Sequence, residues 1–456
     1  MCRGKIHKML KINNLRAFFS PFLGWRLARR GGFWLVLGSL CAMMACCGGD
    51  GRDRIENREN GSSTCTDSVA WDSMQYSRMF RLGSRCGEKI AEIRSILGED
   101  SMVHRMAVKE PFRRVVVLSS AQIGFMARLG VTDRIVGVGE GKYIVDSTLL
   151  ARVAAGEVAE VGNGPSISLE KVVALKPDLV MTFATGGSYD DYQRLKPLGI
   201  PLFVTSEWQE SDPLAKLEWI KLFGMMFGVD SLANSIYEQT KTDYLSSLAP
   251  SAGSGQASRL SSNKGGVAAF GHLALQRLRG HGARGGVAPA EGVADAAGGR
   301  SEGDTSPLVL AGMAFGGVWY APGGNSYTAH LIRAAGGRYL WEGDTTREMK
   351  LSLEEVVMLA DSADVWVNPG AFGTAEEILS AEPRVKDFRA FREKRVCQND
   401  GRKGPGGGND FYESAVARPV ELVGSLRDCI FGREGSDSTA KKEAGSPSWY
   451  RNIYNF

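Results

Sequence analysis

The sequence contains few of the residues that build metal sites. Only five histidines occur in 456 residues, at positions 7, 104, 272, 281 and 330. So few histidines exclude the multi-histidine site that a receptor for free zinc or manganese needs. The eight cysteines include no CxxC pair, which argues against a zinc cluster as well. We therefore predict neither a resident metal nor a cofactor.

Nucleotide-binding and catalytic motifs are also missing. No Walker A sequence occurs, so the chain itself is not an ATPase. The segment VGVGEG at 136–141 lacks the GxGxxG spacing and the helix start that would hold a pyrophosphate, and we interpret it as a strand end. No Ser-His-Asp or Cys-His arrangement has a supporting motif. The sequence therefore predicts a protein that is not an enzyme.

Long hydrophobic runs are scarce. The apolar run at 33–45 is too short to span a bilayer comfortably, and it follows a basic region that ends in two arginines. The sequence MMAC that closes this run resembles a bacterial lipobox, so we interpret residues 1–46 as a signal peptide with Cys46 as the lipidation site. Cys41 and Cys47 are alternative lipidation sites, and an uncleaved membrane anchor is the alternative interpretation. Either way the bulk of the chain lies on the outer side of the membrane.

Positive charge is concentrated at the start of the chain. The formal net charge is +4, but residues 1–49 hold eight basic residues and no acidic one, which leaves 47 basic and 51 acidic residues in the remainder. The remainder therefore offers no broad basic surface for a nucleic acid. We predict no nucleic-acid partner.

Two stretches of the chain have almost the same pattern. SLEKVVALKPDLVMTF occupies 168–183, and SLEEVVMLADSADVWVNP occupies 352–369. Each predicts a short amphipathic helix that begins after a serine N-cap, followed by a turn and an apolar strand. The segments before them, 114–141 and 308–343, also correspond, with the order strand, helix, strand. This duplicated α/β order predicts two similar lobes, each with a mostly parallel sheet.

Composition divides the rest of the chain. Residues 47–107 are polar and predict a flexible tether, and residues 250–306 are rich in glycine and predict a disordered insertion. The expected order is signal peptide 1–46, tether 47–107, N-terminal lobe 108–230, joining helix 231–249, insertion 250–306, C-terminal lobe 307–432 and polar tail 433–456.

Four cysteines lie beyond the signal segment and the adjacent Cys47. An oxidising compartment allows disulfides, and the local pairings are Cys65 with Cys86 and Cys397 with Cys429. The spacing does not decide between these and other pairings.

The order of seven short motifs resembles the substrate-binding lipoproteins of ABC importers, in the class that takes up iron–siderophore complexes, haem and cobalamin. The motifs are RVVVLSS, LGVTDRIVGVG, LEKVVALKPDLV, EWQESDPLAKLEWIKLFGMMFG, WYAPGGNSY, LEEVVMLADSADVWV and GGNDFYESAVARP. The resemblance covers about 112–431 without the insertion, and it implies two Rossmann-like lobes joined by one rigid bridging helix, with a ligand cleft between the lobes. It also implies a monomer that delivers its ligand to a dimeric ABC permease.

Two glutamates of the repeat match the permease-docking acids of this class. They are Glu170 and Glu354, one on each lobe, and two equivalent acids suit a partner with two-fold symmetry. The alternative is that each acid merely favours the first turn of its helix. Glu355 is a neighbouring alternative for the second position.

Ligands of open α/β sheets bind beyond the carboxyl ends of the strands, so the loops there supply the predicted ligand contacts. Aromatic residues dominate this set, which suits a planar or chelate ligand. In the first lobe the residues are Ser119, Ser120, Gln122, Tyr143, Thr185, Gly186, Tyr189, Glu207 and Trp208. In the second lobe they are Trp319, Tyr320, Asn325, Ser326, Tyr327, Trp341, Asn368, Phe372, Asn409, Asp410 and Phe411. For each aromatic residue, packing in the core is the alternative interpretation.

The sequence thus predicts an envelope protein that binds an iron complex or corrinoid and hands it to a permease. His330 is expected to pack or cap a helix, with haem ligation as the alternative. Two rival functions stay open. The first is an enzyme acting on a tetrapyrrole, for which Glu207, Asp410 and Glu413 are the available acids, and the second is a surface scaffold.

Overall fold

The computed structural model describes residues 68–97, 100–163, 166–187, 190–248, 305–433 and 448–455. Residues Thr66–Phe456 form one compact unit, and the described residues all belong to it. The predicted signal peptide, Cys46, Cys65 and nearly all of the glycine-rich insertion lie outside the described residues. Within the described ranges, no helix has the length and apolar character needed to cross a membrane.

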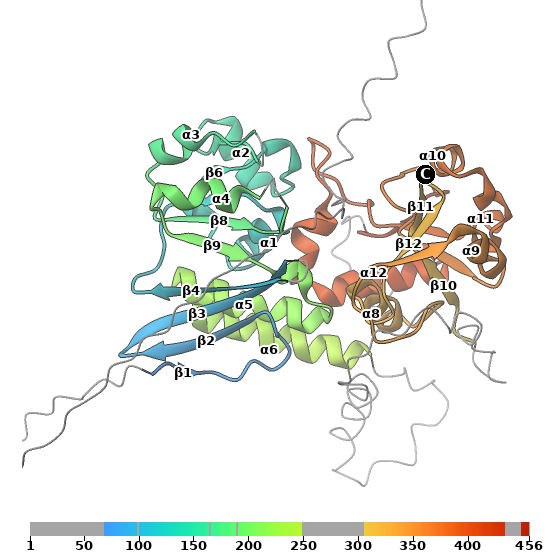
Figure 1. Cartoon of the computed structure of the whole chain (residues 1–456), viewed down its shortest axis with the longest axis horizontal. Helices are drawn as coiled ribbons and strands as arrows, with labels where there is room; N and C mark the ends of the chain where they lie inside the picture. The colour runs from blue at the N-terminus through green and yellow to red at the C-terminus, as the bar shows by residue number, and fades with distance from the viewer. Residues whose placement is uncertain are drawn as a thin grey trace, which may run out of the picture. The chain divides into compact units, whose positions relative to one another are not determined.

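An antiparallel sheet of four strands precedes the first lobe (Figure 1). Its strands are β1 (Ala70–Trp71), β2 (Phe80–Arg85), β3 (Glu88–Leu97) and β4 (Asp100–Val108), paired in that order. The prediction of a flexible tether is therefore wrong for residues 70–107. The polar composition hid the sheet because Glu92 is buried between Arg81 and Arg105, with N–O distances of 2.8 and 2.7 Å. Charged residues of opposite sign are thus paired across neighbouring strands.

Two buried carboxylates, those of Glu210 and Glu218, help to fix the N-terminal sheet to the rest of the fold. Glu218 accepts hydrogen bonds from the backbone N–H groups of Gln75, Tyr76 and Ser77 at 3.0, 2.9 and 2.8 Å. Phe80 adds an aromatic contact with Trp219, with ring centroids 4.9 Å apart.

The first lobe is built on a five-stranded sheet of order β7-β6-β5-β8-β9 in which every pair is parallel. Its central strand, β5 (Val115–Val117), is fully buried. The lobe continues with α1 (Ser120–Arg128), β6 (Ile135–Val138), α2 (Ser147–Ala154), β7 (Ala159–Glu160), α3 (Leu169–Ala174), β8 (Leu179–Phe183), α4 (Asp191–Leu195) and β9 (Leu202–Thr205). Short 3-10 turns are η2 (Thr132–Arg134), η3 (Gly141–Tyr143), η5 (Lys196–Leu198) and η6 (Glu207–Gln209).

The second lobe has its own five-stranded sheet, of order β13-β10-β15-β16-β17. Its elements up to β15 are β10 (Leu308–Ala311), β11 (Met313–Phe315), β12 (Val318–Ala321), α8 (Tyr327–Ala334), β13 (Arg338–Tyr339), β14 (Met349–Ser352), α9 (Leu353–Ala360) and β15 (Val365–Val367). They are followed by α10 (Ala375–Ala381), η7 (Pro383–Asp387), α11 (Arg389–Arg392), β16 (Val396–Gln398), η8 (Asp410–Tyr412), η9 (Ser414–Ala417), α12 (Pro419–Phe431) and β17 (Arg451–Asn452).

The two lobes repeat the same unit in separate sheets. Helix α3 leads into β8, which pairs in parallel with the central strand β5, and α9 leads into β15, which pairs in parallel with β10. The predicted α/β class with mostly parallel sheets is confirmed. The copies differ at the strand before the repeated helix, because β14 pairs with β12 in a small antiparallel sheet, whereas β7 extends the main sheet of its lobe.

Two helices follow the first lobe, namely α5 (Pro213–Phe227) and α6 (Asp230–Ser247). They pack closely because Gly224 has no side chain, and a Cβ there would come within 2.3 Å of the Ala233 Cβ. Helix α6 occupies the place of the expected joining helix at 231–249. Every residue of α5 except Lys221 is buried, so α5 is an internal helix.

The end of the chain belongs to the second sheet. Trp449, Tyr450 and Ile453 are buried, and β17 pairs antiparallel with β16. The prediction of a polar tail is therefore wrong for residues 449–453, since their apolar side chains fill the core of the lobe. The expected Cys397–Cys429 disulfide is present, with 6.1 Å between its Cα atoms. Cys86 is disulfide-bonded too.

Candidate functional site

Three exposed aromatic side chains follow neighbouring strands of the first sheet. Tyr143, Phe183 and Trp208 are 49, 38 and 45% exposed. Tyr143 ends the turn after β6, Phe183 is the last residue of β8, and Trp208 lies in the turn after β9. Because β6, β5, β8 and β9 are adjacent and parallel, their carboxyl ends lie along one edge of the sheet. The three aromatic side chains therefore gather at that edge.

Phe183 was missing from the sequence-based set, although Thr185 two residues later was in it. The rest of its strand, Leu179 to Thr182, is buried, and only this last side chain is exposed. The signal available in the sequence was an aromatic residue at the final position of a buried strand.

The second lobe also exposes aromatic side chains that sequence reasoning missed. Phe315, at the end of β11, is 58% exposed, and Tyr412, in η8, is 59% exposed. Their predicted neighbours are more enclosed, because Tyr320 and Phe411 are half-buried. The ring of Phe411 packs against Tyr412 and Tyr450, with centroids 5.2 and 5.9 Å apart. Phe372 is half-buried as well.

Two predicted tryptophans belong to the core. Trp319 is fully buried, its ring contacts Trp366 and Phe388, and its Nε1–H donates to the carbonyl of Ala311 at 3.3 Å. Trp341 is 5% exposed and packs against Tyr339. In this structure both are packing residues, since their side chains leave almost no surface for a ligand. Strand alternation in β12 turns the Trp319 ring inward, which a motif alone does not show.

A buried polar network lies beneath the aromatic edge of the first lobe. The Nε2 of Gln122 donates to the carbonyl of Thr182 at 2.8 Å and to Oγ1 of Thr205 at 3.1 Å. Glu207 is buried beside Thr205, and burial raises the pKa of its carboxyl group. Gln122 and Glu207 are therefore part of the support for the loops that carry Phe183 and Trp208.

One cation–π contact connects the two lobes. The Nζ of Lys216, in α5, lies 3.9 Å from the ring centroid of Tyr327, in α8. Burial lowers the pKa of Lys216 to about 8, and the charges of Glu207 and Glu210 oppose this shift. Sequence reasoning selected Tyr327 but missed Lys216, because a lysine in the first turn of a helix usually lies at the surface.

Hydrogen bonds connect residues at the start of α8 to one another. Oδ1 of Asn325 lies 2.8 Å from Nε2 of His330, and burial lowers the pKa of this histidine. Ser326 is the N-cap, and its Oγ accepts from the N–H of Ala329. This arrangement agrees with the interpretation of His330 as a packing residue of the helix.

The loop after β16 is fixed by buried acids. Asp410 pairs with Arg402 at 2.9 Å and accepts from Nε1 of Trp449 at 2.9 Å. Asn409 caps η8 through a 3.0 Å bond from the N–H of Phe411. Glu413 accepts from the N–H groups of two residues of the first lobe, and burial raises its pKa to about 7. Both acids make structural bonds.

The remaining predicted contacts occupy loop positions. Ser119 is the N-cap of α1, and Ser120 begins that helix. Thr185 and Gly186 donate their N–H groups to Asp190, and the Nδ2 of Asn368 lies 3.4 Å from the hydroxyl of Tyr450. Tyr189 lies outside the described residues.

The two docking acids differ in their surroundings. Glu170 is exposed in the first turn of α3, which Ser168 caps, and neither a hydrogen bond nor an ion pair to it occurs within the described ranges. Glu354 is in the first turn of α9, where it accepts from Oγ of Ser352 at 2.8 Å and pairs with Arg384 at 3.3 Å. Its own backbone N–H, Ser352 and Arg384 lower the pKa of Glu354.

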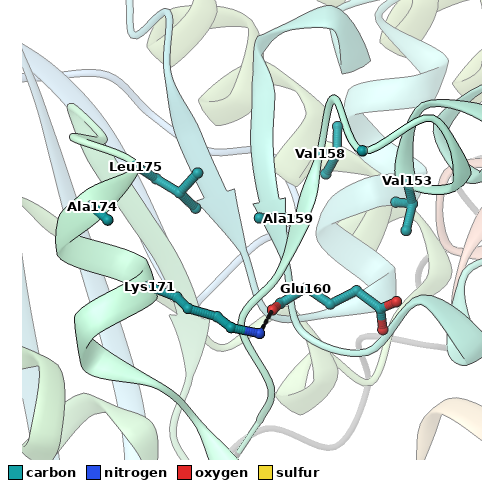
Figure 2. Close-up of a pocket in the computed structure, with 8 residues that line it drawn as sticks. Val153, Val158, Ala159, Glu160, Lys171, Ala174 and Leu175 are labelled. Atoms are coloured by element: carbon teal, nitrogen blue, oxygen red, sulfur yellow. Dashed lines mark hydrogen bonds between the residues drawn. The ribbon is translucent and has the colours of Figure 1, made fainter.

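A surface pocket of about 430 Å³ lies next to Glu170, between α2, β7 and α3 (Figure 2). It is separate from the aromatic residues above, none of which lines it. In the part of the chain that the structure describes, no group of three or more His, Cys, Asp or Glu side chains is arranged to hold a metal ion.

Several curated proteins are similar to this chain. The chain is 21% identical over 332 residues to an uncharacterized lipoprotein of Methanocaldococcus jannaschii, covering 70% of this chain and 65% of that protein. It is 25% identical over 154 residues to an uncharacterized ABC transporter substrate-binding lipoprotein of Bacillus subtilis, covering 33% of this chain and 46% of that protein. It is 28% identical over 116 residues to a vitamin B12-binding protein of Vibrio parahaemolyticus, covering 25% of this chain and 39% of that protein. The chain thus spans less than two thirds of each of these relatives.

A solved periplasmic haem-binding protein from Pseudomonas aeruginosa matches with a TM-score of 0.45 at 17% identity, covering 70% of this chain and 93% of that one. Residues 115–254 match the periplasmic binding protein family. The resemblance found in the sequence is confirmed, and these residues are similar to the periplasmic binding proteins.

Proposed function

We propose that the protein is an extracytoplasmic solute-binding lipoprotein that captures an iron complex, either a siderophore chelate or haem, or cobalamin, and delivers it to an ABC permease. The functions named for two relatives support this proposal. One is the ABC transporter substrate-binding lipoprotein of Bacillus subtilis, and the other is the vitamin B12-binding protein of Vibrio parahaemolyticus. The match to the periplasmic binding protein family supports it as well.

The observation that carries the proposal is the row of exposed aromatic side chains at one sheet edge. Tyr143, Phe183 and Trp208 are held in place by strands and short turns, yet their rings remain partly open to solvent. Burying an aromatic ring is strongly favourable, so rings that the fold leaves open on rigid elements provide free energy for a ligand. Flat apolar faces suit a tetrapyrrole, a corrin ring or the aromatic groups of a chelate.

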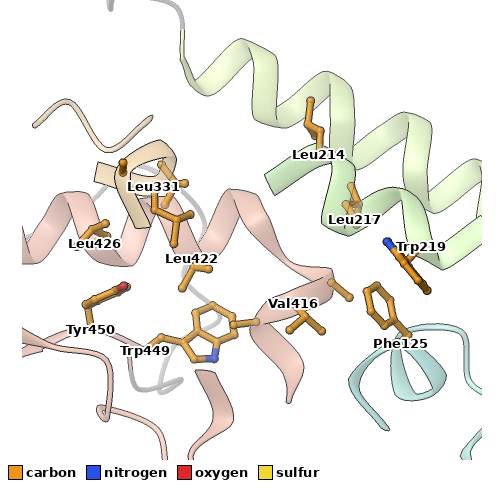
Figure 3. Close-up of a cluster of buried hydrophobic side chains, with 14 of the residues drawn as sticks. Phe125, Leu214, Leu217, Trp219, Leu331, Val416, Leu422, Leu426, Trp449 and Tyr450 are labelled. Carbon is orange, nitrogen blue, oxygen red and sulfur yellow. The ribbon is translucent and has the colours of Figure 1, made fainter. Parts of the chain in front are cut away.

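The frame around this edge is rigid. Buried apolar residues of α1 and α5 form one continuous core with residues of α8 and α12 (Figure 3). Phe125, Leu217 and Leu422 all belong to it. Because close-packed cores deform little, we expect only a small closure around the ligand, with affinity that comes mainly from a preformed surface.

The acids available for catalysis favour binding over conversion. Glu207 is buried under the aromatic edge, Asp410 is paired with Arg402, and Glu413 is bound to backbone N–H groups. An enzyme needs an acid and a base that reach the substrate, but Asp410 and Glu413 are engaged elsewhere in the fold and the carboxyl group of Glu207 is buried. A non-enzymatic binder is therefore the better proposal than a tetrapyrrole-converting enzyme.

Delivery to the permease is proposed to use Glu170 and Glu354, one on each copy of the repeated unit. Their equivalence in α3 and α9 supports a partner built from two similar subunits. Lipid attachment at Cys46 would hold the protein at the membrane of the bacterial envelope, close to that permease. We propose a monomer, since the two lobes of one chain already supply both acids.

A ligand panel tests the proposal. The full-length lipoprotein, purified from membranes, is titrated calorimetrically with haemin, cyanocobalamin, a ferric hydroxamate and a ferric catecholate. One of them is expected to bind with a Kd of about 1 μM or lower. Mass spectrometry of the recovered ligand should show it unchanged, because a converted ligand would instead support the enzyme. Binding of none of the four would contradict the proposed ligand class.

A further inference from the structure

The surface pocket on the first lobe is mainly apolar. Its apolar lining comes from three elements and the turn between two of them, so it is a feature of the folded lobe (Figure 2). The apolar lining residues are Val153, Val158, Ala159, Ala174 and Leu175. An apolar surface recess costs free energy in water and gains it when another apolar group enters.

The two polar side chains at the pocket are engaged with the chain itself. Nζ of Lys171 donates to the backbone carbonyl of Glu160 at 3.0 Å, and the carboxylate of Glu160 accepts from the N–H of Gly141 at 2.7 Å. Polar ligands are held by polar groups that point at them, whereas these groups point at other parts of the fold. The pocket is therefore better suited to an apolar side chain than to a polar small molecule.

Glu170 stands next to this pocket. It precedes Ala174 by four residues in α3, and residues four apart share one face of a helix. Between them, Val173 is 50% exposed. The exposed carboxylate and the apolar recess thus lie on one small surface, which also carries the Lys171 ammonium group bound to the Glu160 carbonyl.

The second copy of the unit repeats this combination. Alignment of the two repeats places Met358 of α9 at the position of Ala174, four residues after Glu354, and Met358 is 73% exposed. Packing within the chain does not explain an exposed methionine at this position. Each acid is thus followed, one turn later, by an apolar feature, which is a recess on the first lobe and a projecting side chain on the second.

We propose that the pocket receives an apolar side chain of the permease subunit that docks at Glu170. In the permease, this apolar side chain should lie beside the basic residue that pairs with Glu170, because Glu170 and the recess are only one helical turn apart. This inference rests on the proposed function and adds a contact to it. Charge would guide the approach of the permease, and the apolar contact would slow its release.

Filling the pocket tests the proposal. Ala174→Trp places a large ring in the recess, Ala174→Ser keeps the recess open, and Leu232→Trp adds a ring at an exposed position of α6. Affinity is measured by thermophoresis between the full lipoprotein and the detergent-solubilised ABC permease complex. Ala174→Trp is expected to weaken permease binding at least about tenfold, while Ala174→Ser and Leu232→Trp bind as the wild type does. Ligand affinity should stay unchanged in all three variants.

The possible failures are distinguishable. If Ala174→Trp binds the permease as tightly as Leu232→Trp does, the pocket contact is wrong and the proposed function stands. If the wild type binds no permease, the proposed function and this contact both fail. A photoreactive phenylalanine at position 174 should cross-link, in cells, to a permease residue adjacent to Arg or Lys. A small molecule retained by the wild type but lost from Ala174→Trp in native mass spectrometry would overturn the proposal.

Discussion

The carboxylate of Glu413 accepts a 2.7 Å hydrogen bond from the backbone N–H of Asp146, which stands 267 residues earlier in the chain. Its second oxygen accepts from the N–H of Val145 at 2.9 Å. Asp146 in turn caps helix α2 through a 2.7 Å bond from the N–H of Leu149. One buried acid of the second lobe therefore fixes the first-lobe loop that follows Tyr143.

This acid should make stability depend on pH. Burial is the main cause that raises the pKa of Glu413 to about 7, and the charges of Asp410 and Asp146 raise it further. A carboxyl group with a raised pKa in the folded state contributes stability below its unfolded pKa, and this contribution is lost as pH rises through about 7. The loss between pH 4.5 and 8 should be about 3 kcal/mol.

Glu413→Gln should remove this contribution. Urea unfolding of both proteins at several pH values gives the difference between their free energies of unfolding, so that other titrating groups cancel. The difference should change through the window from pH 5 to 8. A difference that is constant across this window would show that Glu413 does not titrate there.

The exposed aromatic residues should determine ligand affinity. Trp208→Ala and Phe183→Ala each remove an open ring from the sheet edge, and each should weaken binding of the ligand found in the panel by about tenfold or more. Trp341→Phe is the matched control, since this buried residue should affect stability and leave affinity unchanged. Titration calorimetry checks all three, and equal affinities for wild type and Trp208→Ala would remove this edge from the binding site.

Reversal of both docking charges should abolish association with the permease. Glu170→Arg with Glu354→Arg replaces attraction by repulsion, whereas ligand affinity should not change because these helices carry none of the proposed ligand contacts. Asp243→Arg, at an exposed position of α6, is the control for charge alone. Uptake of the ligand by cells and pull-down of the permease are the two measurements. Unchanged uptake in the double variant would refute the docking assignment.

Loss of the Cys397–Cys429 disulfide should destabilise the second lobe. The two cysteines are 32 residues apart, and a cross-link over such a loop stabilises by about 3–4 kcal/mol in the chain-entropy description. The double variant Cys397→Ala with Cys429→Ala is preferable to a reducing agent, because Cys86 is also disulfide-bonded. Denaturant unfolding measures the change, and an unchanged midpoint would show that the bond adds nothing.

Hydrogen bonds from Arg427 should stabilise the packing of the joining helix α6 against the second lobe. Its Nη2 donates to the carbonyl of Ser247, at the end of α6, at 3.2 Å, and to that of Ala334, at the end of α8, at 2.9 Å. Arg427→Met leaves both carbonyls without this donor, which should cost about 1–3 kcal/mol. Hydrogen exchange should accelerate at the ends of both helices. Faster exchange at α8 alone would mean that α6 is held by other contacts.

The sequence was sufficient for the repeated unit and for the α/β class. The reason is that Ser168 and Ser352, with the apolar patterns that follow them, act locally and predict the same helix and strand in each lobe. The N-terminal sheet escaped prediction because its ion pairs join different strands. Residue types show the charges, while only the pairing of strands shows that Glu92 lies between two arginines.

The candidate site was predictable in its loops and much less so in its side chains. Trp208 and Trp319 both lie next to predicted strand ends, but the first is 45% exposed and the second is fully buried. The difference arises because Trp319 lies on the inner face of the short strand β12, whereas Trp208 lies in the turn η6 after β9. A one-residue shift reverses that outcome, so the loop positions alone did not decide it.

The second sheet is completed only by residues 451–452, which form its outer strand β17 beside β16. During synthesis and export the strands of the first lobe emerge early, and that lobe is free to fold while the rest of the chain is still being made. The edge of β16 in the second lobe stays unpaired until residues 451–452 have been synthesised. Completion of the second lobe therefore depends on a short strand that follows α12 in the chain.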